Sequence, residues 1–70
     1  MSMTSERISG RDLRLLRLAH EVQLMAMAAA WGCSRANITR IEAARRPTEV
    51  AITRYVAALR RAEGLEAAER

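Results

Sequence analysis

Apolar residues recur along this chain at steps of three and four residues, which is the period of an α-helix. No stretch alternates between apolar and polar residues with the period of two that a half-buried strand requires. Three glycines and one proline interrupt this helix-friendly pattern, and they stand at Gly10, Gly32, Gly64 and Pro47. The pattern therefore predicts an all-α fold, in which four to five helices form one compact domain.

The first helix is expected to start after Ser9. The Ser9 hydroxyl can cap the first turn, and Asp12, three residues on, completes an acidic variant of the capping box. The helix should continue to about residues 19–21. The side chains expected on its inner face are Leu13, Leu16 and either Ala19 or His20.

A second, short helix is expected over residues 24–30 and a third over residues 34–43. Gly32 should end the second helix, since glycine adopts a left-handed backbone without steric cost. Ser34 can cap the third. A small side chain, Ala28, falls where the two helices come closest. The residues with the spacing to share one core are Met27, Trp31, Cys33, Ile38 and Ile41.

A fourth helix should follow the only proline. Pro47 disfavours the helical conformation at Arg46, so the chain turns there, and Thr48 can cap a helix that reaches residue 60 or 61. Its buried stripe comprises Val50 or Ala51, Ile52, Tyr55, Val56 and Leu59. The hydroxyl of Tyr55 is expected to reach solvent.

These signals divide the chain into three parts. Residues 1–8 are expected to form a flexible arm, residues 9–61 the helical domain and residues 62–70 a tail that Gly64 separates from the fourth helix. Leu65 is the only large apolar residue of the tail, which predicts a short helix or a contact between copies.

Composition narrows the class of protein. Seventy residues make one domain, which buries only about 60% of the surface that its unfolded chain exposes. The single cysteine, Cys33, cannot form an intrachain disulfide, and residues 1–10 carry charges and no apolar run, so we expect a cytoplasmic protein without a signal peptide or membrane span. Cys33 and the lone His20 do not complete a metal site. No metal, cofactor or enzyme activity is expected, since no catalytic constellation stands at workable spacing.

The distribution of charge favours a polyanionic partner. Every basic residue except His20 is an arginine, and the formal net charge is +4 with an isoelectric point near 11. Most of this excess lies within residues 24–48, where four arginines stand against Glu42 alone. A basic centre of this kind is typical of proteins that bind nucleic acid.

The stretch from Leu24 to Glu42 has the layout of a helix-turn-helix, in which two short helices meet at a turn containing glycine. At 100° per residue, Ile38 and Ile41 face inward and leave a polar outer face on the third helix. The residues expected to read base edges in the major groove of double-stranded DNA are Arg35, Ala36, Thr39 and Arg40. Those expected at phosphates are Ser34, Asn37, Arg45 and Arg46.

From Leu13 to Leu59 the sequence resembles the lambda-repressor-like, Xre/Cro-type DNA-binding domain. The resemblance includes SRANITRIE, the short basic loop RRP and the amphipathic stretch TEVAITRYVAAL. It also includes Arg17, which stands where the family carries a first-helix arginine that pairs with the acid ending the recognition helix. The resemblance therefore implies a partly buried ion pair between Arg17 and Glu42, which fixes geometry more than it adds stability.

Two departures from the family concern the second helix. Members commonly begin it with a polar residue that contacts DNA, whereas this chain has Leu24 there and Gln23 one place earlier, so Gln23 is expected to supply a phosphate contact from the cap. The outer face of this helix is also unusually apolar, and a surface of this kind can bind a protein partner. The residues of that face are Met25, Ala26, Ala29 and Ala30.

The resemblance implies a prokaryotic or phage-type transcriptional regulator, a repressor that acts in the cytoplasm of a bacterium or of a phage-infected host. A homodimer on a two-fold operator is expected because one small domain buries a limited interface on DNA. Leu59 and Leu65 are its candidate contacts. No small-molecule effector is evident. The alternative is a protein-interaction or antitoxin-like module, which would contact its partner through the apolar face of the second helix.

Overall fold

The computed structural model describes residues 8–68, with side chains described as far as Gly64. This part of the chain contains four α-helices and no strand: α1 (Gly10–Ala19), α2 (Leu24–Trp31), α3 (Arg35–Ala43) and α4 (Glu49–Ala68). The all-α prediction is therefore confirmed. Of the arm expected over residues 1–8, only Ile8 lies within the described residues.

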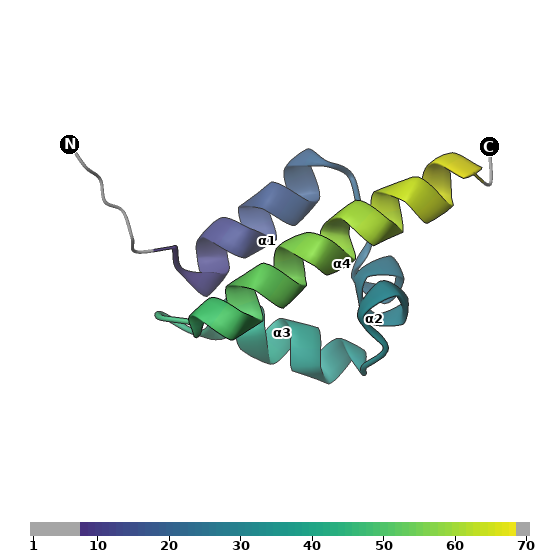
Figure 1. Cartoon of the computed structure of the whole chain (residues 1–70). Coiled ribbons are helices and arrows are strands. Elements are labelled where there is room, and N and C mark those ends of the chain that lie inside the picture. Colours follow the sequence, from purple (N-terminus) through teal and green to yellow (C-terminus); the bar gives the residue numbers. More distant parts are fainter. Residues whose placement is uncertain (1–7, 69–70) are drawn as a thin grey trace.

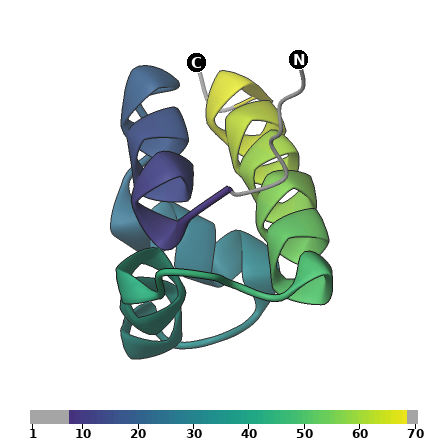
Figure 2. The same cartoon turned by 90° about the vertical axis from the view of Figure 1, so that its left-hand side faces the viewer.

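The long helix α4 organises the domain (Figure 1). Helix α1 runs beside α4, while α2 packs against both α4 and α3, and α3 lies against α1 at the other end of the molecule. Figure 2 shows α1 and α4 side by side, with α3 below α1. The short helices α2 and α3 are joined by a turn of three residues, 32–34.

The polar caps that define the helix starts are present. The Ser9 hydroxyl accepts a hydrogen bond from the Asp12 amide at 3.1 Å, and the Asp12 carboxylate accepts one from the Ser9 amide at 2.9 Å, which completes the capping box. Ser34 and Thr48 cap α3 and α4 through their hydroxyls. At the end of α2, Gly32 has a φ of 84°, the left-handed conformation that suits glycine.

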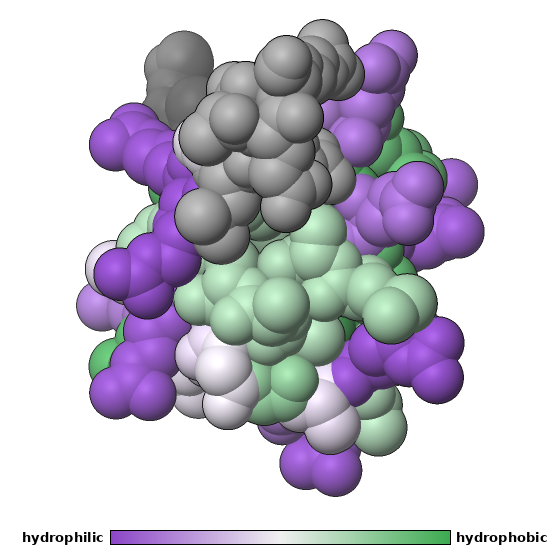
Figure 3. All heavy atoms as spheres, turned by 90° about the vertical axis from the view of Figure 1, so that its right-hand side faces the viewer, coloured by the Kyte–Doolittle hydropathy of each residue, from purple (hydrophilic) through white to green (hydrophobic). Residues whose placement is uncertain are grey.

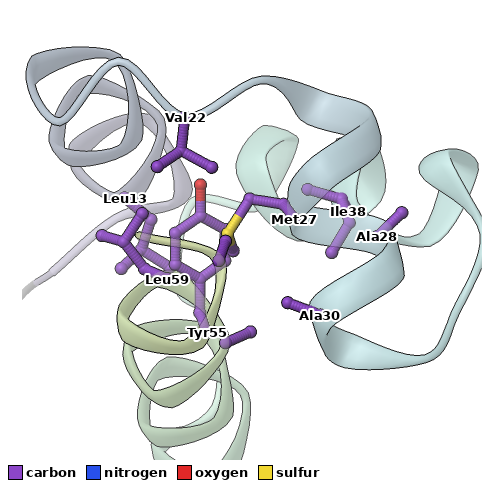
Figure 4. Packing of buried hydrophobic residues seen from close by; sticks show 10 residues of the cluster. Leu13, Val22, Met27, Ala28, Ala30, Ile38, Tyr55 and Leu59 are labelled. Atoms are coloured by element: carbon purple, nitrogen blue, oxygen red, sulfur yellow. The ribbon is translucent and has the colours of Figure 1, made fainter. Parts of the chain in front are cut away.

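The core is small and mainly aliphatic, and one aromatic ring lies at its centre (Figure 4). The Tyr55 ring has no exposed surface and meets the half-buried Trp31 ring edge-on, with centroids 6.3 Å apart. Ala51 takes the inward position of the first turn of α4, and Val50 is exposed. The buried hydrophobic residues are Leu13, Val22, Met27, Ala28, Ala30, Ile38, Tyr55, Ala58, Leu59 and Ala62.

The inner face of α1 differs from the prediction. Leu13 is buried, but Leu16 is 36% exposed and the other inward position belongs to Arg17, whose exposure is 6%. Arg17 can face inward because a carboxylate neutralises it there, and this rotation leaves Leu16 at the edge of the helix. Ala19, the last residue of α1, and His20, which caps the helix, are both exposed and face away from the core.

Helix α4 does not stop before the tail, as the sequence pattern suggested. It continues through Gly64 to Ala68. A glycine within a helix costs only about 1 kcal/mol relative to alanine. That cost does not end a helix whose last described core residue, Ala62, is still packed. The predicted boundary between domain and tail at residues 61–62 therefore falls inside a continuous helix.

A close contact between α1 and α3 depends on Gly10. The Gly10 amide donates a hydrogen bond to the Ala44 carbonyl at 2.8 Å, which ties the start of α1 to the end of α3. A Cβ atom at Gly10 would lie 2.2 Å from the Ile41 carbonyl oxygen. Because that neighbour is backbone, no side-chain rotation could relieve the overlap.

Candidate nucleic-acid interface

The turn between α2 and α3 is held by backbone hydrogen bonds and by the core. The amides of Gly32 and Cys33 both donate to the Ala28 carbonyl, at 2.8 and 3.0 Å. Ala28 itself is buried, as its place in the approach of the two helices predicts. Met27 and Ile38 have no exposed surface, so they anchor α2 and α3 in the common core. Cys33 and Trp31 are half-buried.

The outer face of α3 presents the proposed base-reading side chains together. With Ile38 inward, they span roughly 140° of the helix surface at 100° per residue. All four are exposed: Arg35, Ala36, Thr39 and Arg40. Ala36 lies among longer polar groups and leaves the helix backbone accessible there. An α-helix with arginines beside a small residue has the size and donor pattern that the major groove admits.

The side chains proposed at phosphates lie around this face. Asn37 is half-buried, and Ser34 is exposed while its hydroxyl accepts from the Asn37 amide at 3.3 Å. Gln23 is exposed at the start of α2 and makes no side-chain cap hydrogen bond, so its amide group stays available to a ligand. The start of α2 carries no acidic residue, and a helix N-terminus favours an anion.

A further arginine, which the sequence analysis did not single out, joins the basic loop. One shallow hollow, which we call the basic hollow, lies between the start of α1 and the loop after α3. Its lining includes three exposed arginines, Arg11, Arg45 and Arg46. The hydrogen bond from Gly10 to Ala44 brings these segments together. The sequence signal was the adjacent glycine, whose need for close packing is visible only once its neighbour is known.

No described acid neutralises the arginines on α3 and its loop. Within residues 8–64 the ion pairs join Arg17 to Glu42 and His20 to Glu63. No described carboxylate therefore lies within 4.0 Å of the guanidinium groups of the four arginines between residues 35 and 46. These charges remain available to a polyanion.

The ion pair that the resemblance implied is present and ties three helices together. Arg17 on α1 donates from Nε to Glu42 Oε2 on α3 at 2.8 Å, and from Nη2 to Oε1 at 3.3 Å. Its Nη1 donates to the Val22 carbonyl at 2.9 Å. The hydroxyl of Tyr55 on α4 donates to Glu42 Oε2, the oxygen that also accepts from Arg17 Nε, at 2.5 Å.

The prediction that the Tyr55 hydroxyl reaches solvent is therefore wrong. Glu42 on α3 supplies an acceptor inside the domain, so burial leaves the hydroxyl hydrogen-bonded. We call Arg17, Glu42 and Tyr55 the buried polar triad. Within the described residues, no buried side-chain nitrogen or oxygen lacks a hydrogen-bond partner.

Two members of the triad, Arg17 and Tyr55, have raised pKa values. Hydrogen bonds to Glu42 raise the pKa of Arg17, against the opposing effect of burial. Burial, and then the hydrogen bond to Glu42, raise the pKa of Tyr55 well above its ordinary value. Arg17 is thus a charged guanidinium and Tyr55 a neutral phenol, and both hold α3 in position through their hydrogen bonds to Glu42.

One of the two proposed dimer contacts lies in the core. Leu59 is 3% exposed and lies in the core, so its assignment as a contact between copies is wrong. The side chain of Leu65 lies outside the part that the structure describes.

The outer face of α2 is smaller than predicted. Met25 is 65% exposed, but Ala30 is buried against the core and does not belong to this face. Ala29 is exposed and Ala26 half-buried.

Within residues 8–68, no helix is long and apolar enough to cross a bilayer. Comparison of the chain with protein-family models, with curated proteins and with solved structures found no match.

Proposed function

We propose that this protein binds double-stranded DNA in a sequence-dependent manner, with α3 in the major groove, and acts as a transcriptional regulator in the cytoplasm of a prokaryotic cell or phage-infected host. One observation carries the proposal: four adjacent side chains on the outer face of α3, two of them arginines that pair with no described carboxylate, are exposed beside a basic loop. Arg35 and Arg40 can each donate two hydrogen bonds to a guanine, and Ala36 can meet a thymine methyl.

The basic hollow is proposed to hold the DNA backbone. Arg11, Arg45 and Arg46 come from two segments that the Gly10 hydrogen bond keeps together. Contacts to phosphate carry no sequence information, but they set the register of the reading helix on the duplex. Such a hollow beside α3 would therefore determine how deeply the helix enters the groove.

A homodimer is proposed to bind two half-sites about one helical turn apart, roughly 34 Å. A domain of this size offers a limited DNA interface, and two-fold repetition raises specificity without new kinds of contact. Since Leu59 is buried, the dimer contact would have to use exposed residues.

Selection of bound sequences from a random duplex pool, followed by gel-shift titration of variants, tests the proposal. We expect a palindromic consensus. Arg35→Ala and Arg40→Ala should each weaken binding to the selected site by about 1–3 kcal/mol and relax the preference at one position. Arg60→Ala removes an exposed charge from α4 and is the matched control. Equal binding by wild type and both α3 variants would disprove recognition by α3.

A second function is favoured by one observation, the 65% exposure of Met25 on α2. A protein-interaction or antitoxin-like module would use such a side chain as an anchor. Met25→Ser separates the two functions, because it should leave DNA binding unchanged and abolish binding to a protein partner.

A further inference from the structure

A shallow groove between α2 and α4 has no part in the proposed DNA interface. Its lining residues come from the end of α2 and the middle of α4, and none comes from α3 or the loop after it. They are Ala30, Trp31, Arg54, Ala57, Ala58 and Arg61. Figure 3 looks onto the side of the molecule on which α2 lies in Figure 1, and there a continuous apolar patch has hydrophilic side chains to its left and right.

The floor of the groove suits an apolar side chain. Ala30 and Ala58 are buried at its base and Ala57 is exposed at its rim, so three methyl groups leave room between the helices. The Trp31 ring packs one edge against Tyr55 and is only half-buried, so part of it still faces the groove. An aromatic wall over a floor of alanines is a typical anchor pocket for one aliphatic side chain.

The rim of the groove is positive. Arg54 and Arg61 are both exposed, and they are seven residues apart on the same side of α4, which corresponds to about 10.5 Å along the helix axis. Within residues 8–64, no carboxylate lies within ion-pair distance of either guanidinium. The groove therefore combines an apolar centre with two positive charges that no carboxylate within residues 8–64 neutralises.

The two arginines at the rim favour an acidic partner over a second copy of this chain. A second copy of this chain that packed across a two-fold axis would place the two arginines of one groove near those of the other, which is unfavourable. An acidic segment instead complements both arginines. Carboxylates about 10 Å apart occur at i and i+7 on a helix.

We propose that this groove binds an acidic amphipathic helix of a partner protein. An aliphatic side chain of the partner packs on the alanine floor against Trp31, and carboxylates one above and one below it pair with Arg54 and Arg61. The site shares no residue with α3 or the basic loop, so one molecule can hold DNA and partner together. The proposal stands whether or not α3 reads DNA.

The test uses the full chain and a synthetic probe. The probe is a blocked, alanine-rich helical peptide with Glu at positions i and i+7 and Leu midway between them. Trp31 is the only tryptophan of the protein, so its fluorescence reports directly on the groove. We expect a saturable change in Trp31 emission, which disappears when the peptide carries Ser in place of Leu and weakens when it carries Gln in place of Glu.

Variants locate the binding. Arg54→Gln and Arg61→Gln should each weaken peptide binding roughly two- to fivefold, as expected for exposed ion pairs. Arg60→Gln removes the same charge from a different side of α4 and should leave binding unchanged, as should Arg35→Ala on α3. All four side chains are exposed, so each variant is expected to remain folded. Circular dichroism of each variant checks this.

Four results would overturn the proposal. The first is an unchanged Trp31 emission at all peptide concentrations, and the second is equal weakening by Arg60→Gln and Arg54→Gln. The third is loss of DNA affinity in the Arg54 and Arg61 variants without loss of peptide binding, which would assign the groove to nucleic acid. The fourth is an emission change that follows protein concentration without peptide, which would assign it to a second copy.

Discussion

Substitution of Arg17 tests whether the buried polar triad acts as one unit. In the folded domain the side chains of Arg17 and Glu42 are 8% and 7% exposed. Arg17→Met keeps much of the side-chain volume but leaves the Glu42 carboxylate buried without its counter-charge. Breaking a buried pair in this way costs about 3–5 kcal/mol. A chain of this length has roughly 4–10 kcal/mol of stability in total, so the variant should be largely unfolded or close to it.

Removing the partner as well should restore stability. In Arg17→Met/Glu42→Met no charge is buried, and two apolar side chains fill the space between α1 and α3. The Tyr55 hydroxyl then loses its acceptor, which costs about 1–3 kcal/mol. The triple variant with Tyr55→Phe removes that unsatisfied group too. The free energy of unfolding is therefore expected to be lowest for Arg17→Met, higher for the double variant and highest of the three for the triple variant.

Equilibrium urea unfolding, followed by circular dichroism and Trp31 fluorescence, measures this order. The exposed pair of His20 and Glu63 supplies the control: His20→Gln should change the free energy of unfolding by no more than about 1 kcal/mol. Suppose instead that the losses add, so that the double variant unfolds at lower urea than Arg17→Met. The two side chains would then not be coupled, and the reasoning would be refuted.

Three further predictions concern single positions. Gly10→Ala should lower the free energy of unfolding by about 1–3 kcal/mol in urea titrations, because its Cβ would overlap the Ile41 carbonyl; a neutral effect would show that α1 can shift away. Folded Tyr55 keeps its proton above pH ~10, where the unfolded chain releases it. The stability should therefore fall by about 1.4 kcal/mol per pH unit from there upward, and near-ultraviolet titration of this single tyrosine, with Tyr55→Phe as the control that removes the slope, checks the sign. Arg45→Ala should weaken DNA binding equally for all sequences and reduce the salt dependence by about one counter-ion, and an unchanged slope would exclude a phosphate contact.

Hydropathy and capping signals predict the parts of the fold that are set by neighbours along the chain, whereas the long-range pair of Arg17 and Glu42 was implied only by the family resemblance. Ser9, Gly32 and Thr48 determine helix ends through local hydrogen bonds and backbone freedom, and all three act as expected. The prediction that the fourth helix ends near Gly64 was wrong, because the small free-energy cost of a glycine within a helix competes there with the continued packing of α4. Local signals of that size do not determine which effect is larger.

The faces of the helices were harder to predict where polar residues are buried. Hydropathy places Leu16 inside and Arg17 outside, but the carboxylate of Glu42 reverses the order. Leu59 was predicted both in the buried stripe of the fourth helix and at a contact between copies; only the first is right, because the small domain uses this side chain in its own core. Arg11 was missed for a related reason, since its neighbours in the basic hollow come from a segment more than 30 residues away.

The same long-range contacts connect folding to the proposed function. Glu42 lies near the end of α3 and is held from α1 by Arg17 and from α4 by Tyr55, so the C-terminal end of α3 is fixed from two sides. The loop that carries Arg45 and Arg46 begins two residues later, and Gly10 binds its first carbonyl. If α3 binds DNA as proposed, substitutions in the triad should therefore alter DNA affinity even in variants that remain folded, because they would move Arg45 and Arg46 relative to the outer face of α3.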